Sequence, residues 1–255
     1  MSYSRWMFGM KRVAMKAFIK TIITVLIVLF LSTISCPGQV VSTQNVAKGV
    51  ELAVQGKFKV AKVEFEKALK VDPSNDIAKT SIKTIEELVD RQTESRTAIY
   101  WFKGVANSIK GSWDNAIAEY SKAIDLNPRL AEAYCNRGLA YYNKGQNDEA
   151  ISDFNKAIDL NPKFVQAYYN RGLAYSEKGQ HDKAILEFNK AIDLNPKFAK
   201  AYYSRAVSYY FKEEFDKAME NIYKAQRLGH PVNSEFFKSL VAASGKRKKI
   251  EVPMK

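Results

Sequence analysis

The octapeptide "NKAIDLNP" occurs at residues 155–162 and again at 189–196, and a near copy, "SKAIDLNP", occupies residues 121–128. The copies are spaced 34 residues apart. A fixed period of this length is typical of solenoid proteins, whose repeats bury a continuous core by stacking on their neighbours. The octapeptide therefore predicts an array of similar units, each of which presents the same face to the next.

The unit at residues 165–198 predicts two amphipathic helices. Its first half has aromatic and apolar residues at helical spacing, and a second apolar stripe runs from Ala184 to Ile192. Between the halves, Gly179 suits the left-handed conformation that ends many helices. Pro196 then stops the second helix, because proline cannot continue helical geometry. Helices this short are marginal alone, so the units depend on stacking.

The same frame fits four consecutive units and, with more divergence, an earlier one. The pattern in one unit is Tyr168, Gly172, Tyr175, Ala184, Phe188, Ala191 and Pro196. These residues resemble the consensus of the tetratricopeptide repeat family. The resemblance implies an all-α fold, a right-handed solenoid of helix–turn–helix repeats. The predicted repeats are 42–75, 97–130, 131–164, 165–198 and 199–230.

Three segments lie between or after the repeats. Residues 76–96 carry an amphipathic stripe that predicts a connecting helix. Residues 231–244 predict a C-terminal capping helix, which an open solenoid end needs to cover its apolar face. Residues 245–255 form a basic tail, which we expect to be disordered.

The first 35 residues differ from the rest of the chain. They contain five basic residues and no acidic residue, followed by the uncharged run "TIITVLIVLFLSTI" at 21–34. A basic segment, a short apolar segment and small residues describe a secretory signal peptide, and the run is short for a membrane-spanning helix. The pattern predicts export, with residues 1–35 acting as a signal peptide or as an N-terminal membrane anchor.

The end of this segment, "STISC" at 32–36, resembles the lipobox of bacterial lipoproteins. The resemblance implies lipidation of Cys36 and attachment of the mature protein to a bacterial membrane. Plain cleavage near this site and an uncleaved anchor are the alternatives. In each case we expect a membrane-associated or periplasmic array at the cell envelope, outside the cytoplasm.

The composition and motifs argue against several functions. There is no nucleophile elbow, phosphate-binding loop or HExxH motif, so we expect no enzyme activity and no small-molecule substrate. The two cysteines and two histidines form no cluster, which predicts no metal and no cofactor. The net charge of +13 is concentrated at the two ends of the chain, so we expect no nucleic-acid partner.

In tetratricopeptide proteins the first helices of the repeats line a concave groove that binds a peptide or helix of another protein. The resemblance carries this role to the residues at matching positions, which are Trp101, Cys135, Asn136, Leu139, Tyr142, Gln166, Tyr169, Asn170, Leu173, Lys200, Tyr203 and Tyr210. Among them, Trp101, Cys135, Tyr169 and Tyr203 should form one column. The alternative for this column is that its side chains pack between adjacent repeats. The carboxylate clamp of some family members is incomplete here.

The sequence thus predicts a non-catalytic scaffold or adaptor that binds partner proteins in a concave groove at the bacterial cell envelope. One rival is a structural element that self-assembles end to end. Another is an accessory protein that binds glycans or cell wall, because tyrosines and asparagines in a groove can stack on sugars and hydrogen-bond to them.

Overall fold

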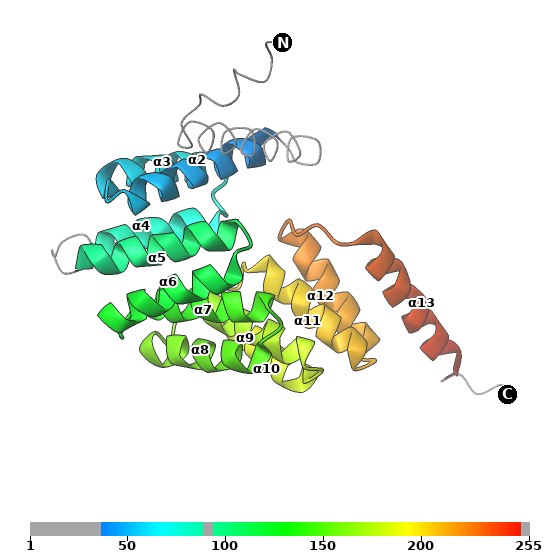
Figure 1. Cartoon of the computed structure of the whole chain (residues 1–255). Coiled ribbons are helices and arrows are strands. Elements are labelled where there is room, and N and C mark those ends of the chain that lie inside the picture. The colour runs from blue at the N-terminus through cyan, green and yellow to red at the C-terminus, as the bar shows by residue number, and fades with distance from the viewer. Residues whose placement is uncertain (1–36, 89–93, 251–255) are drawn as a thin grey trace, which may run out of the picture. The chain divides into compact units, whose positions relative to one another are not determined.

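The computed structural model describes residues 37–88 and 94–250, and within these ranges the chain forms helices and no strand (Figure 1). Residues 1–36, which hold the predicted signal and Cys36, lie outside the described part. The described helices are α2 (Pro37–Val54), α3 (Phe58–Val71), α4 (Asp76–Leu88), α5 (Glu94–Ile109), α6 (Trp113–Leu126), α7 (Ala131–Asn143), α8 (Asn147–Leu160), α9 (Val165–Glu177), α10 (His181–Leu194), α11 (Ala199–Phe211), α12 (Phe215–Arg227) and α13 (Ser234–Ile250). The predicted all-α repeat fold is confirmed.

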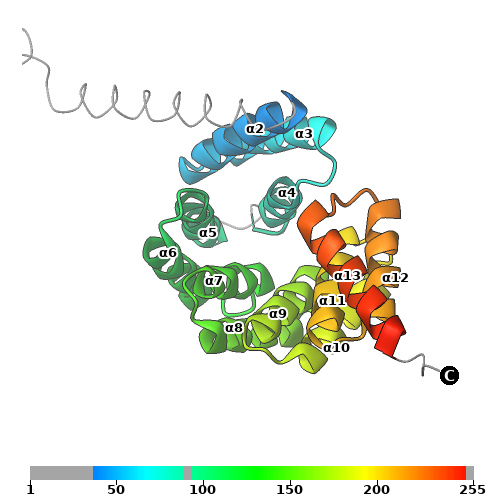
Figure 2. The same ribbon diagram turned by 90° about the vertical axis from the view of Figure 1, so that its right-hand side faces the viewer.

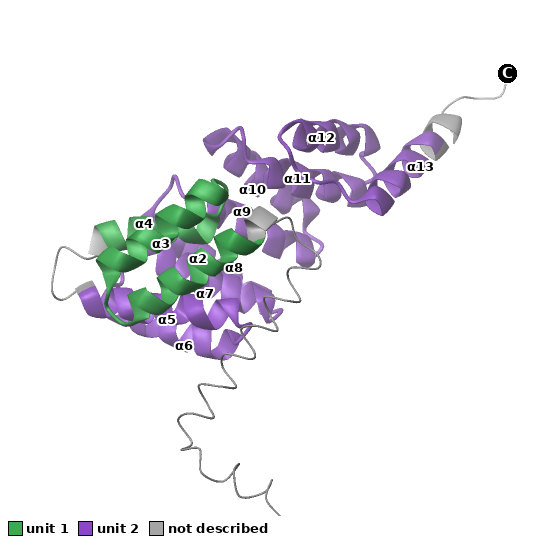
Figure 3. Ribbon diagram, turned by 90° about the horizontal axis from the view of Figure 1, so that it is seen from above, with its two compact units in different colours: residues 1–87 green, residues 88–255 purple. Residues whose placement is uncertain are grey.

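The chain divides into two compact units, residues 1–87 and 88–255, which Figure 3 colours separately. In unit 1, α2 and α3 form a helix pair, and the Ser42 hydroxyl of α2 donates to the carbonyl of Ala68 at 3.3 Å. Asn75 joins this pair to α4: its amide nitrogen donates to Ser42 Oγ at 3.1 Å, while its Oδ1 accepts from the amide of Ala78 at 3.0 Å. Asn75 thereby caps the start of α4.

Unit 2 contains four helix pairs in chain order, α5–α6, α7–α8, α9–α10 and α11–α12, followed by α13. Each second helix also packs on the first helix of the next pair. Within this unit α5, α7, α9 and α11 lie on the inner side of the curve, and α6, α8, α10 and α12 on its outer side (Figure 2). Alanines and aromatic residues of successive pairs share one core, so the pairs stack as the sequence repeat requires.

A glycine at the eighth position of the repeat lets the two helices of a pair approach closely. A Cβ atom added to Gly172 of α9 would lie 2.6 Å from Cε1 of Phe188 in α10, and Phe188 is fully buried. The last repeat has Ala206 at the glycine position and Ile222 at the aromatic position. A larger residue on the first helix is thus matched by a smaller one on the second, and both belong to one buried cluster. A small residue therefore lies where the two helices of the pair cross closely.

The turn within a repeat uses a left-handed residue. Gly179, between α9 and α10, has a φ of 69° and donates its amide to the carbonyl of Ser176. In the last repeat the corresponding residue is Glu213, which keeps a φ of 60° although it has a side chain. The backbone geometry of the turn is thus imposed by the helix packing, even where the residue does not favour it.

The C-terminal helix differs from the prediction. Leu240 of α13 is fully buried against the last repeat, together with partly buried Phe236 and Phe237, which suits a cap. However, α13 continues to Ile250, so the expected disorder from Gly245 onward is wrong for residues 245–250. Lysine and arginine are good helix formers, and a positive charge is favourable near a helix C-terminus.

Candidate interaction surface

The column of fifth-position residues is largely inside the protein. Trp101 of α5 is 1% exposed and Cys135 of α7 is 3% exposed. The prediction that these two side chains line an open groove is therefore wrong. Burial also raises the pKa of the Cys135 thiol to about 12, so this sulfur stays protonated and acts as a small apolar residue in the core.

The two tyrosines of the column are half-buried and bridge neighbouring elements. The Tyr169 ring contacts Phe188 and Phe198, with the Phe198 ring at a centroid distance of 5.0 Å, and its hydroxyl lies 3.3 Å from Ser204 Oγ of α11. Tyr203 contacts His230 at 4.8 Å. These contacts favour the alternative that fifth-position residues pack between repeats, which sequence spacing alone left open.

A second group of predicted residues does reach the surface. Leu139 of α7 is 36% exposed, and the neighbouring Asn136, Tyr142, Asn170 and Leu173 are partly exposed on α7 and α9. We call these five residues the inner strip, since they lie on the inner helices of unit 2 (Figure 2). The strip thus contains the sixth and ninth positions of two adjacent repeats and the twelfth position of the first of them.

The remaining predicted residues that the structure describes lie on α9 and α11, outside the strip. Gln166 is partly exposed near the start of α9, and Lys200 is exposed near the start of α11. Tyr210 contacts Phe236 of α13 at a centroid distance of 5.4 Å and belongs to the cap contact. Cys36, the predicted lipidation site, lies outside the described residues.

The inner strip is uncharged but retains hydrogen-bonding capacity. The amide of Asn170 donates one bond to Cys135 Sγ at 3.8 Å, which leaves its carbonyl oxygen and a second N–H for other partners. Burial, and then the nearby Glu177 carboxylate, to which the hydroxyl also donates a hydrogen bond, raise the pKa of Tyr142 to about 12. Apolar Leu139 and Leu173, which lie on the same helices as these polar groups, suit a partner peptide that has apolar side chains on one side and backbone groups available for hydrogen bonds.

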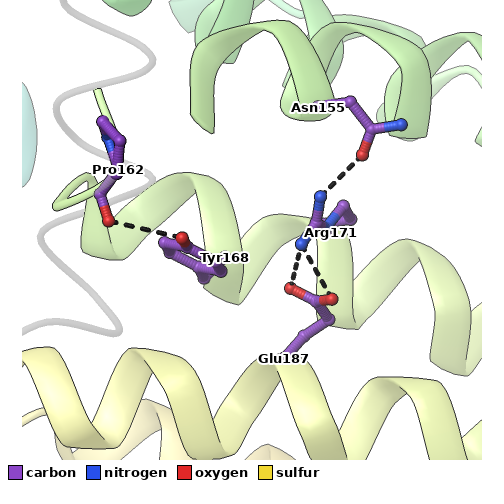
Figure 4. Close-up of polar contacts among 5 residues, drawn as sticks. All are labelled: Asn155, Pro162, Tyr168, Arg171 and Glu187. Carbon is purple, nitrogen blue, oxygen red and sulfur yellow. Dashed lines mark hydrogen bonds and ion pairs between the residues drawn. The ribbon is translucent and has the colours of Figure 1, made fainter. Parts of the chain in front are cut away.

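An arginine network, which the sequence reasoning missed, joins successive repeats. Arg171 of α9 donates to both carboxylate oxygens of Glu187, at 2.8 and 2.7 Å, and to Oδ1 of Asn155 in the preceding repeat at 2.6 Å (Figure 4). The adjacent Tyr168 hydroxyl donates to the carbonyl of Pro162 at 3.3 Å. The bonds of Arg171 join α9 to both α8 and α10, so this residue contributes to the packing of two successive repeats.

The same network recurs one repeat earlier and one repeat later. Arg137 bonds Asp153 and Ser121, and Arg205 bonds Asn221 and Asn189. Each arginine reaches a partner 16 residues ahead and another 16 residues behind. The signal in the sequence was an arginine that recurs every 34 residues directly before the glycine position, with polar residues 16 positions before and after it.

The described residues offer little for chemistry beyond binding. No group of three or more histidine, cysteine, aspartate or glutamate side chains that could hold a metal ion occurs in residues 37–88 and 94–250. Within that same part of the chain, no helix has the length and apolar character needed to cross a membrane.

Comparisons with known proteins agree with this architecture. The family model described as "TPR repeat" matches residues 109–145 and 138–179, and the model described as "Tetratricopeptide repeat" matches 165–198. No curated protein sequence matches the chain. Among solved structures, a crystal structure of MamA is 30% identical, with 71% of this chain and 93% of that chain covered and a TM-score of 0.50.

Two further structures are similar at lower identity. A MamA RS-1 ArsTM double mutant is 21% identical, with 71% of this chain and 94% of that chain covered and a TM-score of 0.51. The TPR protein YrrB is 20% identical over 72% of this chain and 84% of its own, with a TM-score of 0.49. From the helix pairs, the repeat matches and the likeness to MamA, the chain belongs to the tetratricopeptide repeat family.

Proposed function

We propose that this protein is a non-catalytic interaction scaffold, held at the bacterial cell envelope, that binds an apolar segment of a partner protein on its inner strip. The fold supports a protein–protein interaction scaffold in general. The observation that carries the more specific proposal is the partial exposure of Leu139 and Leu173, which occupy the same position of two stacked repeats on adjacent inner helices.

The chemistry of the strip favours an uncharged partner segment. An acidic peptide needs cations arranged along the inner helices, but the strip contains none, and Lys200 stands at its edge. Leucine side chains gain from contact with apolar residues, and the amides of Asn136 and Asn170 can bond a peptide backbone. The expected ligand is therefore an extended peptide or an amphipathic helix with apolar residues facing α7 and α9.

The location is proposed from the N-terminal sequence. The basic segment, the apolar run at 21–34 and the lipobox-like end at Cys36 support export followed by attachment to a membrane. A scaffold in this position would hold its partner near the membrane surface. This placement agrees with a role in assembling envelope proteins.

Photo-crosslinking in cells tests the proposal. A photoreactive residue replaces Leu173 in the inner strip, and the matched control replaces Leu186, which is 65% exposed on the outer helix of the same repeat. We expect one protein to be captured from position 173 and not from position 186. Leu139→Asp should then reduce capture from 173, because a charge would be placed against an apolar ligand.

The other outcomes identify the rival functions. Capture of a second copy of this chain at position 173 would replace the adaptor function with self-assembly. Capture of cell-wall fragments would replace it with glycan binding. Equal background capture at both positions would remove the inner strip as the binding surface.

A further inference from the structure

The outward face of α3 carries exposed apolar residues. Val60 is 53% exposed, Val63 is 47% exposed and Val71 is 41% exposed. Spacings of three and eleven residues place all three on one side of the helix, where exposed Lys67 and Lys70 also lie. We call Val60, Val63, Lys67, Lys70 and Val71 the α3 outer face.

The other repeats provide an internal comparison, since their second helices present the same positions to solvent. Where α3 has Val60, the later repeats have a polar or charged residue in each case, namely Asn115, Glu149, Lys183 and Lys217. Where α3 has Lys70, three of them have Asp125, Asp159 and Asp193. At the positions of Val60 and Lys70, α3 is therefore more apolar and more basic than most of its counterparts, whereas the later repeats also have lysine at the position of Lys67 and leucine at the position of Val71.

The beginning of α3 departs from its counterparts in the same direction. Lys59 stands in the first turn, where the later repeats have Asp114, Asp148, Asp182 and Asp216. Three of these aspartates pair with a lysine of the next repeat, and α4 follows α3 in place of such a repeat. That difference explains the loss of an acid but not the gain of a lysine, which the helix dipole disfavours at this end.

Two exposed lysines of α3, Lys59 and Lys70, remain available for an external anion. The buried Glu64 is bound by Lys48 at 3.1 Å and by Lys67 at 2.9 Å, so its charge is already neutralised. Within residues 37–88, no ion pair holds Lys59 or Lys70. An apolar stripe flanked by unpaired lysines is the pattern of a helix that lies in a lipid interface.

The packing of unit 1 places this face near the point where the predicted anchor joins. The hydrogen bond from Ser42 to Ala68 holds the last turns of α3 beside the first turns of α2. Helix α2 begins at Pro37, directly after Cys36 and the apolar run at 21–34. Lys70 and Val71, in the last turn of α3, are therefore on the side of unit 1 where the chain would leave a membrane attached at or before Cys36.

We propose that the α3 outer face rests on an anionic lipid surface, with its valines among the lipid headgroups and with Lys70 and the neighbouring Lys59 against the phosphates. This inference rests on the membrane attachment in the proposed function. Anchoring by the N-terminal segment would hold unit 1 near the membrane, and contact through the α3 outer face would fix the orientation of unit 1 against the bilayer.

The test uses the full chain reconstituted into vesicles of phosphatidylglycerol and phosphatidylcholine in equal parts. A photoreactive residue replaces Val63 or, as the matched control, Leu186, which occupies the same repeat position in α10 and is exposed. We expect lipid adducts at 63 and few at 186. The double variant Lys59→Asp/Lys70→Asp, which copies the acids of the later repeats, should lower the adduct at 63 by about tenfold or more.

Flotation of the same vesicles distinguishes the proposed membrane attachment of the chain from the proposed contact of the α3 outer face with lipid. If the chain floats but positions 63 and 186 give equal lipid adducts, the α3 outer face is not on the membrane, while the proposed attachment stands. If the chain does not float, both are overturned. A protein adduct at 63 with a second copy, or a lipid adduct unchanged by the lysine substitutions, would also overturn the assignment to anionic lipid.

Discussion

The guanidinium of Arg171 donates to Oδ1 of Asn155 at 2.6 Å across the boundary between two repeats. The same side chain also holds Glu187 within its own repeat, so one residue couples the pairing of helices to the stacking of repeats. Arg137 and Arg205 repeat this arrangement on either side. The array is thus held by polar contacts at fixed spacing as well as by its apolar core.

Replacing Arg171 by alanine should lower the free energy of unfolding by about 1.5–3 kcal/mol, because partly buried Glu187 loses a charged hydrogen-bonding partner. Arg171→Lys should also be less stable, since a point charge cannot serve both partners as a planar guanidinium does. Urea unfolding followed by circular dichroism measures both. The exposed Arg96→Ala on α5 is the control, and an equal loss there would contradict the coupling role.

Gly172→Ala should destabilise the protein although alanine is the better helix former. The added Cβ overlaps the Phe188 ring, and overpacking costs about 1–3 kcal/mol against a gain of about 1 kcal/mol in helix propensity. The double variant Gly172→Ala/Phe188→Ile copies the natural pair Ala206 and Ile222 and should recover stability. Thermal midpoints of the single and double variants form the test, and purely additive losses would exclude the steric explanation.

Glu213→Gly should raise the free energy of unfolding by about 0.5–1 kcal/mol. A side chain at a φ of 60° costs about 1–2 kcal/mol, and the greater freedom of glycine in the unfolded chain offsets part of the gain. The reverse change, Gly179→Glu in the preceding repeat, should be destabilising. Glu213→Ala, which also removes the side-chain interactions of Glu213, is the control, and a urea midpoint no higher for Glu213→Gly than for Glu213→Ala would show that the turn is not strained.

Cys135 should resist alkylation in the folded protein at pH 8. Its thiol is buried and its pKa is raised to about 12, so both access and thiolate are lacking. Peptide mapping after iodoacetamide treatment measures labelling at this residue alone. Full labelling in guanidinium is the control, and rapid labelling of the native protein would place Cys135 at an open surface.

Glu64→Gln should make unit 1 less stable at pH 7 but not at low pH. A hydrogen bond from Lys67, opposed in part by burial, lowers the pKa of Glu64 below its ordinary value of 4.5. A lowered pKa in the folded state contributes stability above about pH 4.5 that is lost as the pH falls through the folded value. The difference in the stability of unit 1 between Glu64→Gln and wild type should therefore disappear in acid.

Hydrogen exchange in α2 and α3 peptides, compared with wild type at each pH, reports this local stability. Glu66→Gln on the exposed side of α3 controls for removal of one carboxylate. A Glu64→Gln deficit that persists unchanged in acid would show that the carboxylate charge is not what stabilises unit 1.

Much of the fold was predictable because each repeat is specified by residues that act locally, within one helix or one turn. The apolar spacing from Ala184 to Ile192 predicts a helix, Gly179 predicts its preceding turn, and Pro196 predicts its end. The structure places α10 and its turn accordingly. The extent of α13 was predicted less well, since a run of lysines has no apolar stripe to distinguish a helical end from a tail.

The candidate site was predicted only in part. Helical spacing groups residues along one side of α7 and α9, but it placed buried Cys135 and partly exposed Leu139 on the same surface. The difference arises because a fifth-position side chain points toward the next repeat, and its burial depends on how closely the two helices stack. The arginine network escaped notice for the same reason, as each arginine and its two partners lie in three different helices.

The sequence by itself determined that this protein is a stack of helix pairs with period 34, because periodicity, turns and stops act within one repeat. Only the tertiary structure decided which inner residues remain exposed, which arginines bind repeats together and which valines on α3 face solvent. Exposure and long-range hydrogen bonds depend on the distance and angle between neighbouring helices, and those are set by the packing of whole side chains across repeats.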